Sequence, residues 1–134
     1  MMLKSCQKEM SEKTFWLIAC IGFLFVGIWA YYVGREGIVM YEWYFGVRTK
    51  TKTVNLPGWF SDACWSCSLI SAFGFIWEGL KKIPPKWFLS LWFICSFSEI
   101  IQEILPAEVA TFDWGDLVAY QIVFIIFFFV RRIK

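Results

Sequence analysis

Polar side chains that could bind a ligand gather near the ends of long apolar stretches of the sequence. Asp62 lies near the start of one stretch, and Glu99 and Gln102 lie near the end of the next. Asp113 and Asp116 open the last one. A charged group at the centre of a spanning helix costs roughly 2.5–3.5 kcal/mol on insertion scales, and less near the interface. Such groups usually face a bundle interior or a wet cavity. We therefore predict that the side chains of Glu99, Gln102, Asp113 and Asp116 converge in one cavity.

The chemistry of these side chains favours binding over catalysis. Carboxylate and amide oxygens suit a hard cation better than zinc or copper. A lipid headgroup or an envelope precursor is an alternative ligand for the same pocket. The chain has no histidine, which removes the commonest general base at neutral pH. The sequence identifies no catalytic residue, and paired carboxylates leave acid–base or metal-dependent catalysis open. We expect no cofactor beyond a hard cation at the acidic residues.

Helix capping is the structural alternative for several of these acids. Asp113 is placed to accept hydrogen bonds from the first free amides of a helix, and Asp116 three residues later completes a capping-box-like pattern. Asp62 could serve as a helix cap or as the partner of a loop Lys or Arg. Glu99 is harder to explain structurally, because it lies nearly two turns before Pro106.

A second chemistry is indicated by Cys64-Trp65-Ser66-Cys67, a C-x-x-C pattern in an apolar stretch. This spacing suits disulfide exchange and would make the chain a membrane thiol oxidoreductase. The five cysteines form no regular disulfide framework, however, and a free Cys in an apolar segment usually behaves as a small hydrophobe. Cys64 and Cys67 are therefore redox residues of an alternative function only.

Membrane-spanning helices are the elements that must position these residues. Of the 134 residues 59% are hydrophobic and only 18% charged, whereas soluble chains run at about 45–50% apolar and about 25% charged. A helix needs about 20 apolar residues to cross a hydrocarbon core of ~30 Å. We therefore predict an all-α membrane protein, with a four-transmembrane-helix bundle in a single domain. The domain covers residues 1–134, and its spans lie at about 14–33, 59–77, 87–105 and 113–130.

The distribution of basic residues predicts the orientation of this bundle. Nine of the thirteen Lys and Arg residues fall in the N-terminal tail, the second loop and the C-terminal segment. The positive-inside rule therefore places both termini in the cytoplasm and the acidic residues toward the outer face. The longer loop, residues 35–58, and the 106–112 loop are then extracytoplasmic. Alternating Thr and Lys over residues 48–54 favours a short strand or hairpin arm.

Small residues on the first two spans predict close packing between helices. Gly27, Ala30 and Gly34 lie on one face of the first span, where another helix could approach closely. The expected partners are the lipid bilayer and either further copies of the chain or a larger membrane complex. Nucleic acid is not expected at a net charge of only +2. An oligomeric pore-forming effector is the main alternative function, although the first and fourth spans are almost wholly apolar.

Two stretches of the chain resemble the signature of VanZ-like membrane proteins. The first begins Ser98-Glu99-Ile100-Ile101-Gln102 and continues, after a Pro-containing loop, with Thr111-Phe112-Asp113-Trp114-Gly115-Asp116-Leu117. The second is Leu56-Pro57-Gly58-Trp59-Phe60-Ser61-Asp62, with Trp65 at roughly the place where many relatives have a His. The resemblance covers about a third of the chain and implies a small multi-pass protein of the bacterial cytoplasmic (inner) membrane and envelope. It points to the binding residues Glu99, Gln102, Asp113, Asp116, Asp62 and Trp65.

Overall fold

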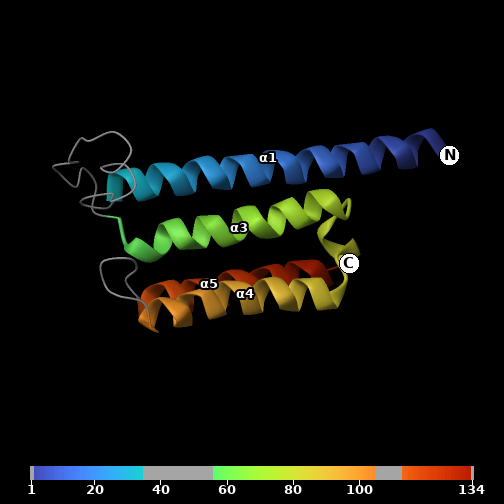
Figure 1. The fold of residues 1–134 in the computed structure, drawn as a ribbon. Helices are drawn as coiled ribbons and strands as arrows, with labels where there is room; N and C mark the ends of the chain where they lie inside the picture. The colour runs from blue at the N-terminus through green and yellow to red at the C-terminus, as the bar shows by residue number, and fades with distance from the viewer. Residues whose placement is uncertain (1, 35–55, 105–112, 134) are drawn as a thin grey trace.

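Four long helices lie side by side and alternate in direction (Figure 1). The computed structural model describes residues 2–34, 56–104 and 113–133. Within these ranges the elements are α1 (Met2–Gly34), α3 (Gly58–Ile76), the 3-10 turn η1 (Leu80–Lys82), α4 (Pro85–Ile104) and α5 (Trp114–Arg132), and there is no strand. The start of α1 and the end of α5 lie at the same end of the assembly (Figure 1).

The predicted all-helical fold is confirmed for the described residues. Helices α3, α4 and α5 begin and end within two residues of the predicted spans. Helix α1 is longer than the predicted first span of 14–33, because it already begins at Met2 and includes the N-terminal tail. That tail contains no Gly or Pro and is rich in Lys and Glu, which are good helix formers. The predicted arm at 48–54 and the 106–112 loop lie outside the described residues.

Three helical stretches are long and apolar enough to cross a membrane, namely Ser11–Val33, Pro85–Ile104 and Trp114–Arg132. Helix α3 is not one of these three; it contains Asp62 and four serines, and it is the central helix, which packs against α1, α4 and α5. Its serine hydroxyls are bonded to backbone carbonyls. Ser66 Oγ donates to the carbonyl of Ala63 at 2.9 Å, and Ser71 Oγ donates to that of Cys67 at 2.7 Å. Burial of α3 among the other helices therefore leaves these hydroxyls hydrogen-bonded.

Helix α1 packs closely on α3, as the small residues of the first span predict. A Cβ placed on Gly27 would lie 3.2 Å from Cys64 Cβ, and Ala30 is buried. Farther along the interface, the Trp16 ring lies against Gly74. Ser68 Oγ of α3 also donates to the Cys20 carbonyl of α1 at 2.9 Å. Close approach and an interhelical hydrogen bond are the contacts that hold helices together in lipid.

An apolar core fixes α4 and α5 against α3 toward the end of the assembly where the chain termini lie. Its buried residues are Ile70, Leu80, Ile83, Phe88, Leu91, Val123 and Phe124. At this end, Arg131 Nη2 of α5 donates a hydrogen bond to the Ile83 carbonyl at 2.6 Å. Midway along the helices, Gln121 of α5 accepts a hydrogen bond from Trp92 Nε1 and donates to Ser96 Oγ of α4. These contacts set the rotation of α4 and α5, and so determine which side chains point inward at the opposite end.

Candidate binding site at the polar end of the bundle

The hydroxyl of Tyr120 lies between two carboxyl groups from different helices. Tyr120 Oη of α5 is 3.3 Å from Glu99 Oε1 of α4 and 3.4 Å from Asp62 Oδ1 of α3. Gln102 Nε2, one turn after Glu99, donates to the same Glu99 oxygen at 3.1 Å. We call these four residues the Tyr120 cluster. Two helices, α3 and α4, thus bring acceptor oxygens to the phenol of a third helix, α5.

Two of the acidic residues of this region are deeply buried. Glu99 is only 2% exposed, and Asp116, one turn before Tyr120 on α5, is 3% exposed. Glu99 lies five residues before the end of α4 and Asp62 four residues after the start of α3. At 1.5 Å per residue these depths are about 8 Å and about 6 Å. The cluster therefore lies just inside the helix ends, where burial of an acid costs less than at the bilayer centre.

Helical periodicity explains why Glu99 points inward. The buried residues Phe88 and Leu91, the partly buried Cys95, and then Glu99 and Gln102 follow one another at spacings of three or four residues along α4. Side chains at this spacing share one face of a helix. The face that contributes apolar residues to the core therefore carries a carboxyl and an amide at its far end.

Asp113 acts as the N-cap of α5, as the capping alternative predicts. Its Oδ1 accepts a hydrogen bond from the Gly115 amide at 2.8 Å, and its side chain is exposed. Asp116 lies in the first turn of the same helix, where a carboxylate interacts favourably with the positive helix end. The cap prediction for Asp62 is wrong, because Pro57 occupies the N-cap of α3.

The hydrogen bonds that define the Tyr120 cluster do not include Trp65, Cys64 or Cys67. Cys64 is 6% exposed and is covered by Gly27 of α1, and the Trp65 ring borders the same glycine. Both cysteines are free thiols, and Cys67 is partly buried. Cys64 thus fills the close α1–α3 contact, which is the packing role of a small hydrophobe.

Tyr120 is the residue that sequence reasoning missed. It lies four residues after Asp116, on the same face of α5. A tyrosine inside an apolar helix usually finds a hydrogen-bond partner for its hydroxyl, so its type and spacing could have placed it with the acids.

The polar groups of the cluster are two carboxyls, which accept, and one phenol and one amide, which donate to them. Within the described ranges, no three His, Cys, Asp or Glu side chains are grouped so that they could hold a metal ion. Comparison of the chain with protein-family models, with curated proteins and with solved structures gives no match.

Proposed function

We propose that this chain is a VanZ-like protein of the bacterial cytoplasmic membrane that binds a primary ammonium group in the Tyr120 cluster. The ammonium belongs to a lipid headgroup or to an envelope precursor at the outer face. The observation that carries the proposal is the position of the Tyr120 hydroxyl between Glu99 and Asp62, at 3.3 and 3.4 Å. Ionisable groups at membrane depth are candidate functional sites by default, and this pair comes with a shared partner.

The membrane topology of the proposal uses all four helices. Three of them are long and apolar enough to span, and α3 crosses as the fourth because it packs side by side with α1, α4 and α5. The start of α1 and the end of α5 lie at the same end of the assembly, as an even number of spans requires (Figure 1). Nine of the thirteen basic residues lie in segments assigned to that end, so the positive-inside rule makes it cytoplasmic. The Tyr120 cluster then faces outward.

An ammonium group matches the cluster in number and kind of contacts. A primary ammonium has three N–H donors and no acceptor. Asp62, Glu99 and Tyr120 offer one oxygen acceptor from each of three helices. Hydrogen bonds from an ammonium to a carboxylate are charge-assisted and about twice as strong as neutral ones. Binding would neutralise charge at a buried position, which lowers the cost of keeping the acids there.

Ligand-dependent stability of the purified protein tests this proposal. Ethanolamine should raise the unfolding midpoint of the wild type, while choline should not, because its nitrogen has no N–H donor. Glu99→Gln should abolish the shift. Glu103→Gln should retain it, because Glu103 is exposed and lies one turn farther along α4. An equal shift with ethanolamine in Glu99→Gln, or with choline in the wild type, would contradict ammonium binding at the cluster.

Thiol labelling in intact cells tests the orientation separately. Single-cysteine variants at Thr51, Pro84 and Ala107 are treated with a membrane-impermeant reagent. Labelling at Thr51 and Ala107 but not at Pro84 is the result expected for an outward-facing cluster. The reverse pattern would place the cluster in the cytoplasm and make a cytosolic ligand the better hypothesis.

Two sources of the ammonium remain to be distinguished. Phosphatidylethanolamine added to the protein should reproduce the ethanolamine shift if the ligand is a lipid headgroup. If free ethanolamine stabilises the protein and the phospholipid does not, the ligand is a soluble amine such as an envelope precursor.

A further inference from the structure

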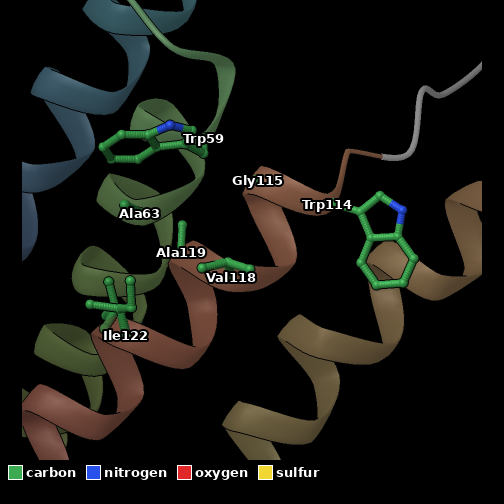
Figure 2. Close-up of a pocket in the computed structure, with 8 residues that line it drawn as sticks. Trp59, Ala63, Trp114, Gly115, Val118, Ala119 and Ile122 are labelled. Carbon is green, nitrogen blue, oxygen red and sulfur yellow. The ribbon is translucent and has the colours of Figure 1, made fainter.

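An apolar groove of about 430 Å³ runs between α3 and α5 (Figure 2). Its volume falls within the range of about 300–1,000 Å³ that small-molecule sites occupy. The residues that line it are Trp59, Ala63, Trp114, Gly115, Val118, Ala119, Ile122 and Val123. Ala63 of α3 and Ala119 of α5 add only small side chains to the lining where the two helices lie beside each other (Figure 2).

The groove lies on a different face of α5 from the Tyr120 cluster. Successive residues of a helix are rotated by about 100°. Gly115, Val118 and Ile122 line the groove, and they are centred about 145° away from Asp116 and Tyr120 on the helical wheel. The groove is therefore a separate feature, and an inference about it does not depend on ammonium binding at the cluster.

The length of the groove matches one leaflet of a bilayer. Its lining on α5 extends over nine residue steps from Trp114 to Val123, which is about 14 Å of helix. Half of a ~30 Å hydrocarbon core is ~15 Å. The two tryptophans lie at the end nearest the helix starts, where indole rings favour the membrane interface. A lipid chain descends through one leaflet from that level, whereas a transmembrane helix of a partner would cross both.

The carboxylate of Asp113 lies at the interfacial end of the groove. Cβ atoms placed on Gly58 and on Gly115 would lie 3.9 Å and 3.2 Å from the Asp113 carboxylate oxygens. The one on Gly115 would also lie 3.2 Å from Trp59 Cδ1. The exposed Asp113 side chain is therefore beside the groove-lining residues that begin α3 and α5. Its negative charge favours a cationic headgroup and disfavours an anionic one.

We infer that the groove between α3 and α5 holds one acyl chain of an amine-bearing phospholipid whose amine contacts the Asp113 carboxylate. Lipid is the solvent of this face, since α5 is long and apolar enough to span a membrane. The acyl chain fills the apolar groove, and the positively charged amine pairs with the Asp113 carboxylate at the interfacial end of the groove. The protein thus carries a structural lipid site beside its polar end.

Native mass spectrometry of the full chain in detergent tests the inference. The protein is titrated with dioleoyl phosphatidylethanolamine or dioleoyl phosphatidylglycerol, and bound lipids are counted. Val118→Trp should fill the groove and remove the bound lipid without loss of folding, because Val118 is 53% exposed. Ile126→Trp is the matched control, since Ile126 is equally exposed on α5 but lies beyond the groove. Equal binding by these two variants would overturn the lipid site.

The headgroup contact is tested by Asp113→Asn. Asparagine caps a helix about as well as aspartate, so this variant removes the charge and keeps the cap. The wild type should prefer the ethanolamine lipid, and the variant should lose up to about fivefold of that preference, the range for an exposed ion pair. An unchanged preference would overturn the amine contact. A different result would assign the groove to a second copy of the chain and overturn the lipid site. In that result the wild type binds no lipid and forms dimer ions, and Val118→Trp abolishes these ions. Glu99→Gln should retain the bound lipid that Val118→Trp removes, so failure here is distinguishable from failure of ammonium binding at the cluster.

Discussion

Replacing Tyr120 by phenylalanine removes only the hydroxyl that joins α3, α4 and α5 at the polar end. The two hydrogen bonds are long, at 3.3 and 3.4 Å, against about 2.7–2.8 Å for a typical O–H···O bond. Hydrogen bonds between membrane helices average ~0.6 kcal/mol and reach ~1.7 kcal/mol. Two weak bonds, with the buried Glu99 left less satisfied, give an expected loss of about 1–2 kcal/mol in the free energy of unfolding.

A double-mutant cycle with Glu99→Gln isolates the contact that carries the proposed site. Equilibrium unfolding in mixed micelles, followed by circular dichroism, should give a coupling free energy of about 0.6–1.7 kcal/mol between the two substitutions. The same cycle with Glu103→Gln is the control and should be additive. Additivity within ~0.3 kcal/mol in the Glu99 cycle would refute the view that Tyr120 binds Glu99 in the folded protein.

The remaining predictions concern helix packing, capping and pH. Gly27→Leu should destabilise the protein by about 1–3 kcal/mol, because the added Cβ would meet Cys64. Gly22→Leu is the control and should be near neutral, since nothing described lies within 4 Å of a Cβ at that position. Equal effects in denaturant unfolding would contradict the α1–α3 contact. Asp113→Ala should cost ~1 kcal/mol of stability, and Asp113→Asn much less; equal losses would argue against the cap. Hydrogen bonds from Lys13 and Lys82 lower the pKa of Glu78 below its ordinary 4.5. The stabilising effect of these hydrogen bonds should be present above pH ~4.5 and be lost as the pH falls through the lowered pKa of Glu78. Glu78→Gln is the control and should show no such loss in acid unfolding curves.

The helices were predictable because their signals are local. Runs of about twenty apolar residues predicted α3, α4 and α5 to within two residues of their ends. The cap at Asp113 follows from its type and from its position before an apolar run. The start of α1 was not predictable from apolar length, because helix formers such as Lys and Glu continue a helix beyond the apolar segment.

The arrangement of the polar residues required the tertiary structure. Composition and spacing alone marked Asp62, Glu99 and Gln102 as polar groups near one end of an apolar bundle. The rotation of α5 about its axis decides that Tyr120 reaches both acids, and the approach of Gly27 decides that Cys64 is covered. Residues that are 21 and 58 positions apart meet only through helix rotation and depth. Those quantities are set by side-chain packing along whole interfaces, which local periodicity does not encode.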